Sequence, residues 1–155
     1  MSSGKVHKRA NIITGACVVG GSILFGIPSV VVAGALAGSV IGTIVTPDYD
    51  VNGSLPASFL TKTPVIKLFW NTFWRPYQLM FKHRSFWSHF PFVGTTGRIL
   101  YIAFWIWFWS WILWQLGFDI SPEGVYNWFV MNADFWIITF LVWCGQDIVH
   151  WVLDL

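Results

Sequence analysis

Long apolar runs separated by polar breaks organise this chain. The first run extends from Asn11 to Ile27; Pro28 and Ser29 interrupt it, and a second run continues from Val30 to Val45. Proline ends a helix, and both runs are short for a full membrane span. The pattern therefore predicts a tight helical hairpin over residues 11–45.

The middle of the chain is more polar and carries the breakers Pro47, Gly53 and Pro56, which predict a loop from residue 46 to 64. Residues 65–82 then combine tryptophan and phenylalanine with lysine and arginine, a mixture that suits the lipid headgroup region. We therefore expect residues 46–90 to form a loop and an interfacial helix, broken near Pro76.

Two more helices are predicted in the last third. A tryptophan-rich apolar run gives a helix over residues 95–117, a short loop over 118–126 follows, and a final helix covers 127–154. We expect an all-α fold, with residues 1–155 forming a single integral membrane helical bundle of about four transmembrane helices plus the interfacial helix.

Composition supports this class. Of 155 residues, 55% are hydrophobic and 10% charged, against about 25% charged in soluble domains. The net charge of +2 gives no support for nucleic-acid binding, and the two cysteines show no pairing motif for a disulfide or a zinc thiolate site.

Glycines repeat every four residues in the second helix, at Gly34, Gly38 and Gly42. Such a smooth face lets two membrane helices approach closely. We expect it to pack on the first helix, through Ala16 and Gly20. A homo-oligomer through the same glycines is the alternative, and membrane lipids are the other expected partner.

If the helices cross the membrane in turn, all four histidines lie on one membrane face. The same face holds the lysines and arginines, and the opposite loops carry none. By the positive-inside rule this face is cytoplasmic, which predicts a bacterial inner-membrane protein with both termini in the cytoplasm.

The segment GQDIVHWVLD places three potential metal ligands on one helical stripe, and imidazoles with carboxylates suit zinc or manganese. A dinuclear site would need about six or more such side chains from several segments. The chain offers eight metal-ligand candidates: His7, Asp48, Asp50, His83, His89, Asp147, His150 and Asp154.

Arg84 lies between two of these candidates, in the segment KHRSFWSH. Its guanidinium is suited to hold a substrate phosphate through two hydrogen bonds, or to contact lipid headgroups; both interpretations stay open. His83 and His89 are six residues apart and cannot share one face of a straight helix. Either the chain bends there, or one of the two is a ligand.

The motifs SGxxH, PDxD, HRSxxSH and DxxHxxxD, in this order along a small multi-span chain, resemble the YdjM-like membrane-bound metal-dependent hydrolases and related metal-binding membrane proteins of cyanobacteria and phages. The resemblance implies a metal-dependent hydrolase, distantly similar to zinc-dependent phospholipase C. It carries over the same eight positions as metal ligands.

Two functions are therefore expected. As a hydrolase acting on a lipid or phosphate ester, the protein would use its metal to polarise the substrate, Arg84 to bind it, and Asp50 or Asp147 to accept a proton. As a non-catalytic protein, it would use the metal as a structural staple and assemble with itself or a partner.

Overall fold

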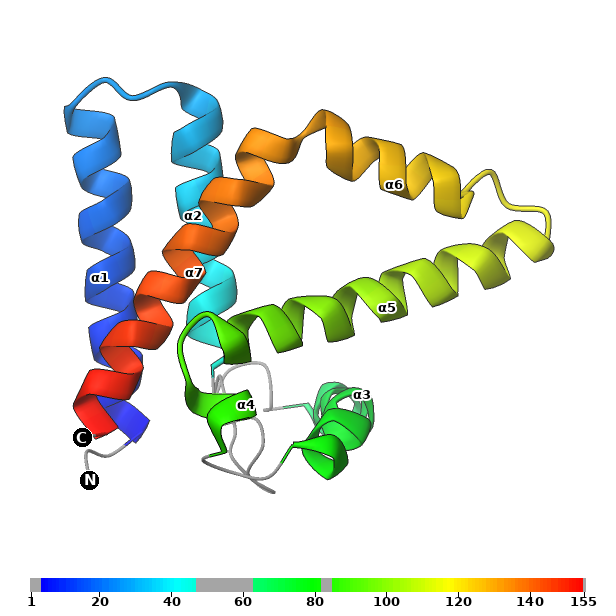
Figure 1. The fold of residues 1–155 in the computed structure, drawn as a ribbon, viewed down its shortest axis with the longest axis horizontal. Helices are drawn as coiled ribbons and strands as arrows, with labels where there is room; N and C mark the ends of the chain where they lie inside the picture. The colour runs from blue at the N-terminus through cyan, green and yellow to red at the C-terminus, as the bar shows by residue number, and fades with distance from the viewer. Residues whose placement is uncertain (1–3, 47–62, 82–84, 155) are drawn as a thin grey trace.

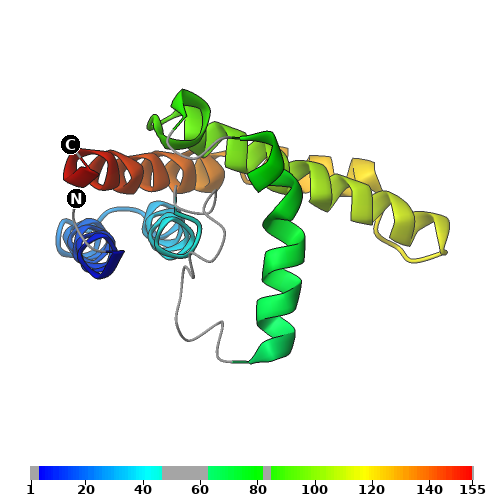
Figure 2. The same ribbon diagram turned by 90° about the horizontal axis from the view of Figure 1, so that it is seen from below.

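The computed structural model describes residues 4–46, 63–81 and 85–154, with side chains from Val6 onward. These residues are all-α and form seven helices without a strand. Two layers are visible in Figures 1 and 2: α1 and α2 lie side by side in one, and α4 to α7 form the other. Helix α3 runs across the layers, from the level of the second past that of the first (Figure 2).

The predicted hairpin is present, but its first helix starts earlier than expected. Helix α1 covers Gly4–Leu24 and α2 covers Ser29–Ile44. Gly26 in the connecting turn has a φ of +63°, a left-handed conformation that glycine adopts without strain. Pro28 then occupies the N-cap position of α2, directly before its first helical residue.

The glycine face of α2 packs on α7 (Ala133–Asp154), and the expected contact with Ala16 and Gly20 is wrong. A methyl group added at Gly34 would lie 2.8 Å from the Phe135 carbonyl oxygen, and one at Gly38 would lie 2.5 Å from the Thr139 carbonyl oxygen. A methyl group at Gly20 would meet nothing within 4 Å.

Glycine thus sets the close approach of α2 to α7 within one chain. Thr139 Oγ1 adds a hydrogen bond to the Gly34 carbonyl oxygen at 3.2 Å across this contact. A homo-oligomer through Gly34, Gly38 and Gly42 stays a prediction, and it would require α7 to leave this face.

The helix predicted over 127–154 is divided in two. Helix α6 covers Pro122–Met131 and ends at Asn132, directly before α7. Ser121 caps α6, because its Oγ accepts a hydrogen bond from the Gly124 amide at 3.0 Å. Helix α5 covers Val93–Gln115, close to its predicted bounds, and diverges from α7 so that α6 bridges their far ends (Figure 1).

Helices α3 (Pro64–Met80) and α4 (Phe86–His89) lie at the end of the molecule where α1 begins and α7 ends (Figure 1). The predicted break at Pro76 is wrong, because α3 continues through this residue. Trp74 and Tyr77 of α3 are buried, and both rings contact Tyr101 of α5. These aromatic contacts hold the otherwise exposed α3 in place.

Two helices of the described residues, α5 and α7, are long and apolar enough to cross a membrane, and α2 is apolar but shorter. The described residues therefore do not confirm the expected bundle of about four transmembrane helices. Figure 2 views α1 and α2 nearly end-on, whereas α5 and α7 run lengthwise across the view. The glycines of α2 allow α7 to cross α2 obliquely at close distance. Helix α5 points away from the α1–α2 hairpin (Figure 1).

Candidate metal centre

His7 lies inside α1, whereas the hairpin expected from the sequence began only at residue 11. It shares a helix face with Asn11, one turn later. Asn11 is fully buried: its Nδ2 donates to the Gly42 carbonyl oxygen at 3.3 Å, and its own carbonyl oxygen accepts from Gln146 Nε2 at 2.8 Å. These bonds anchor the start of α1 against α2 and α7, so His7 is buried at the same interface.

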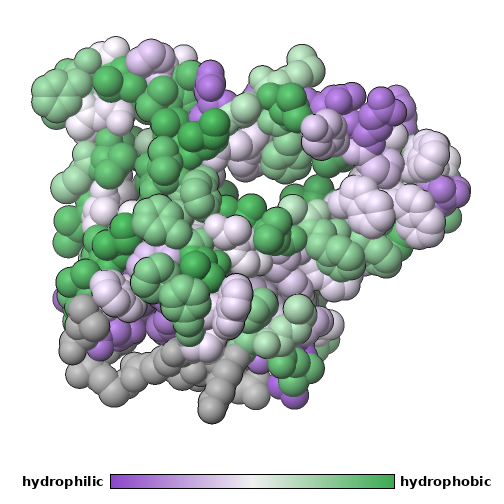
Figure 3. Space-filling view, in the orientation of Figure 1, coloured by the Kyte–Doolittle hydropathy of each residue, from purple (hydrophilic) through white to green (hydrophobic). Residues whose placement is uncertain are grey.

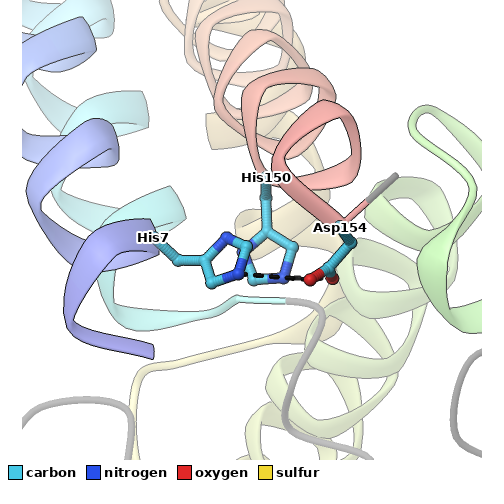
Figure 4. A group of neighbouring side chains, drawn as sticks. All are labelled: His7, His150 and Asp154. Carbon is cyan, nitrogen blue, oxygen red and sulfur yellow. Dashed lines mark ion pairs between the residues drawn. The ribbon is translucent and has the colours of Figure 1, made fainter. Parts of the chain in front are cut away.

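His150 and Asp154 lie one turn apart on α7 and face His7 (Figure 4). Asp154 Oδ1 is 3.2 Å from His7 Nε2, and Asp154 Oδ2 is 3.5 Å from His150 Nε2. The two imidazole rings stack with 4.1 Å between their centroids. One potential ligand atom from each residue lies within 4.8 Å of the other two. We call these three residues the metal cluster.

His89 lies at the edge of the metal cluster. Helix α4 directs its ring toward His150, with 6.2 Å between the ring centroids. Its Nδ1 lies 3.2 Å from Ser88 Oγ, and both residues are buried. The three histidines that the structure describes therefore lie at the same end of the molecule.

Asp147, one turn before His150, is held by α5 instead of joining the metal cluster. Its Oδ2 accepts hydrogen bonds from Arg98 Nη2 and from Thr95 Oγ1. The side chains of Arg98 and Asp147 are both 1% exposed, so the pair is fully buried. A buried carboxylate needs such a partner, because an unpaired charge in an apolar interior is strongly disfavoured.

Arg98 also donates a hydrogen bond to the C-terminal end of α2. Its Nη1 donates to the Val45 carbonyl oxygen at 3.4 Å, and Trp143 Nε1 donates to the same oxygen at 3.2 Å. Carbonyl groups at a helix C-terminus lack partners within the helix and attract cations. In the sequence, Arg98 stands out only as one of the basic residues. An ionisable side chain at the edge of an apolar run was the signal that could have identified it.

The other residues predicted for the site lie outside the described part of the chain. They are the metal-ligand candidates Asp48, Asp50 and His83, together with the phosphate-binding candidate Arg84.

The chemistry of the metal cluster fits a divalent metal ion. Two imidazoles and a carboxylate are common zinc ligands, and catalytic zinc sites in proteins use three protein ligands. His7 and His150 are nearly inaccessible, whereas the side chain of Asp154 retains 16% of its exposure. His7, His150 and Asp154 are therefore the residues that would hold the ion.

A family model described as "Uncharacterized metal-binding protein (DUF2227)" matches residues 2–154. No curated protein matches the chain, and no solved structure does. The family model covers almost the whole chain, including every residue of the metal cluster. The chain therefore belongs to this family of metal-binding proteins.

Proposed function

We propose that this protein is a membrane-embedded, metal-dependent hydrolase that acts on a phosphate ester at the membrane face where its histidines gather. The observation that carries the proposal is the convergence of His7, His150 and Asp154 at one end of the molecule. Three protein ligands leave a coordination position for substrate or water, as in catalytic zinc sites.

Zinc is the metal we propose, because imidazole suits it better than it suits harder cations, and manganese is the second choice. When bound, the ion would supply Lewis acidity toward a phosphoryl oxygen. A second ion would need further ligands. His89 is near enough to contribute, and Asp48, Asp50 and His83 are the remaining sequence candidates.

The protein's own side chains would bind the substrate and move protons. His89 borders the metal cluster and is placed to exchange a proton with a group held there. Asp147 is less suited to the role of base, because Arg98 and Thr95 both bond to one of its oxygens. Arg84 and Asp50 keep the roles proposed from the sequence, phosphate binding and proton acceptance.

Several observations support a membrane location. Only 11% of the most apolar stretch of α5 is buried, whereas the core helix of a soluble protein is mostly buried. Large apolar side chains cover much of the surface in Figure 3. Exposed apolar surface on this scale is typical of membrane contact. By the positive-inside rule, the distribution of lysine and arginine supports a cytoplasmic location for the metal-cluster end, in a bacterial inner membrane.

A structural metal site is the second candidate function. The ligands of the metal cluster come from α1 and α7, which are far apart in the chain and pack against each other. A metal held between them would tie the helix ends together without catalysis. This alternative requires that protein side chains fill every coordination position.

Two measurements on the purified protein test the proposal together. Elemental analysis should find zinc in the native chain and little in the variant His150→Ala. The zinc-loaded protein should then hydrolyse a phospholipid or a generic phosphodiester, and chelator-treated protein should not. A zinc-loaded, folded protein that hydrolyses none of these substrates, with its metal fully ligated by side chains, would leave only the structural function.

A further inference from the structure

The metal cluster depends on how α7 is turned about its own axis. Asp147, His150 and Asp154 are spaced three and four residues apart, so they lie on one stripe of α7. His150 and Asp154 meet His7 from this stripe. A rotation of α7 would carry both ligands away from His7. The contacts that fix this rotation therefore bear directly on metal binding.

Asp147 is the residue of this stripe that α5 holds. Thr95 and Arg98 lie three residues apart on one face of α5, and both donate hydrogen bonds to Asp147 Oδ2. Arg98 Nη2 also lies 3.4 Å from Thr95 Oγ1, so the three buried side chains form a closed network. Helix α7 cannot turn about its axis without breaking these bonds.

Arg98 is anchored to its surroundings on further sides. Its Nε donates to the Gly94 carbonyl oxygen at 3.1 Å, one turn earlier on α5, and its Nη1 donates to the Val45 carbonyl oxygen at the end of α2. Its Cζ lies 5.6 Å from the centroid of the Trp143 ring on α7. The planar guanidinium carries five N–H donors in a fixed geometry, so one side chain can hold three helices together.

Apolar packing between α5 and α7 is loose beyond this network. A cavity of about 530 Å³ lies between the two helices there, with Ile99 and Ala103 of α5 and Phe140 and Trp143 of α7 in its wall. Side chains that line such a space lack the van der Waals contacts that would hold them in register. The buried polar network, in contrast, joins the two helices directly.

The start of α5 also carries α4 and therefore His89. The Gly94 amide donates to the Phe90 carbonyl oxygen at 2.8 Å, and a methyl group added at Gly94 would collide with the Ser88 carbonyl oxygen. Helix α4 is thus folded tightly onto the first turn of α5. The network that joins α5 to α7 therefore also helps to set the 6.2 Å between the rings of His89 and His150.

We propose that Arg98 is a positioning residue of the metal centre. By binding Asp147, it fixes the rotation of α7 that turns His150 toward His7. Through α5 and α4, it also keeps His89 beside the metal cluster. This inference rests on the metal site of the proposed function and not on hydrolysis. Residues that only orient metal ligands typically change metal affinity about 10–100-fold.

Zinc affinity of the purified full chain, measured by competition with a chelator, tests the proposal. Arg98→Met/Asp147→Leu, which we call the apolar pair variant, leaves neither charge buried without its partner. Its zinc Kd should rise about tenfold or more. Its zinc stoichiometry at saturation should not change, because every residue of the metal cluster is present. Arg98→Lys should also raise the Kd, and it serves if the apolar pair variant fails to fold, because an ammonium keeps the charge but cannot make all of the guanidinium's bonds.

Gly38→Ala is the matched control for a general loss of stability. It disturbs the packing of α2 on α7 at Thr139, three turns before His150, and leaves the polar network intact. It should lower the denaturation midpoint but keep the native zinc Kd. A purely structural role of Arg98 predicts instead that zinc affinity falls in step with the midpoint in every variant.

A second measurement needs no metal. The rings of Phe90 on α4 and Trp151 on α7 lie 6.3 Å apart. In Phe90→Cys/Trp151→Cys, in a background without the exposed native cysteine, the rate of disulfide formation with the oxidant diamide reports how closely α4 approaches α7. Adding the apolar pair substitutions should slow this reaction severalfold, and adding Gly38→Ala should not.

An unchanged zinc Kd or an unchanged crosslinking rate in the folded apolar pair variant would overturn the proposal, and so would an equal loss of zinc affinity in Gly38→Ala. The proposed function can fail separately. If the native chain binds no zinc, the proposed function is wrong, and the crosslinking rate alone decides whether Arg98 positions α4 against α7. If the chain binds zinc but hydrolyses nothing, both measurements still decide the role of Arg98.

Discussion

The imidazole of His7 stacks on that of His150, with 4.1 Å between the ring centroids, and so joins α1 to α7. The carboxylate of Asp154 reaches both rings. Side chains from the two ends of the chain therefore converge on one point, as a shared metal ion requires.

The first prediction concerns metal content. His7→Ala and His150→Ala should each lower bound zinc at least about tenfold. Loss of a residue that only orients a ligand already lowers metal affinity about 10–100-fold, and loss of the ligand itself costs more. Elemental analysis of purified protein measures the change.

Ile148→Ala is the matched control for this test, because Ile148 lies two residues before His150 on α7 and is exposed. It should retain native zinc content. Unchanged zinc in both histidine variants would exclude the metal cluster as the site.

The second prediction concerns the buried Arg98–Asp147 pair. Arg98→Met or Asp147→Asn leaves one partner buried without its counter-charge, which should lower the free energy of unfolding by about 3–5 kcal/mol. Removing both charges in Arg98→Met/Asp147→Leu should cost less than the sum of the single changes. Denaturation midpoints in detergent measure these effects.

The same variants separate two roles of Asp147. If Asp147 serves mainly to pair with Arg98, folded Asp147→Asn should keep most of its zinc. Complete loss of zinc from a folded Asp147→Asn protein would instead restore Asp147 as a direct ligand, as predicted from the sequence.

The third prediction compares two glycines. Gly38→Ala places a methyl group 2.5 Å from the Thr139 carbonyl oxygen and should destabilise the protein by about 1–3 kcal/mol by separating α2 from α7. Gly20→Ala meets no atom within 4 Å and should be neutral or stabilising by about 1 kcal/mol, since alanine favours a helix. Equal midpoints for the two variants would contradict the observed packing.

The fourth prediction concerns orientation. Lys8→Cys should be labelled by a membrane-impermeant thiol reagent only after the cells are opened, and Asp119→Cys should be labelled in intact cells. The background should lack Cys17, which is exposed, whereas Cys144 is buried. Labelling of position 8 in intact cells would reverse the proposed orientation.

The fifth prediction concerns turnover. Arg84→Ala should lower hydrolysis without lowering zinc content, because guanidinium binds phosphate and is not a metal ligand. His89→Ala should lower hydrolysis as well. If its zinc content also falls, His89 is a metal ligand. If its zinc content is unchanged, His89 serves in proton transfer. Full activity in both variants would reject their proposed roles.

Sequence patterns predicted the helical class, and they predicted that His150 and Asp154 share one face of the last helix, as they do on α7. His7 and His89, expected on the same side as these residues, lie near them in the structure. Local signals were sufficient here, because helical periodicity and chain order determine which side chains point the same way.

Contacts between distant helices were harder to predict. The glycines of α2 identified a packing face but not its partner, since α1 also carries small residues and only the folded chain shows that α7 fits. The pairing of Asp147 with Arg98 likewise depends on the crossing of α5 and α7. The loop expected over residues 118–126 is wrong in its second half, where Ser121 and Pro122 form a recognisable helix start.

The contact between α1 and α7 has a consequence for the synthesis of the protein. His7 emerges from the ribosome early, but it gains its metal-binding partners only when translation has passed Asp154. Pairing between such distant segments is slow to form and leaves apolar surface uncovered meanwhile. Metal capture would then be a late step in biogenesis, and a chain interrupted before α7 would be unable to retain the ion.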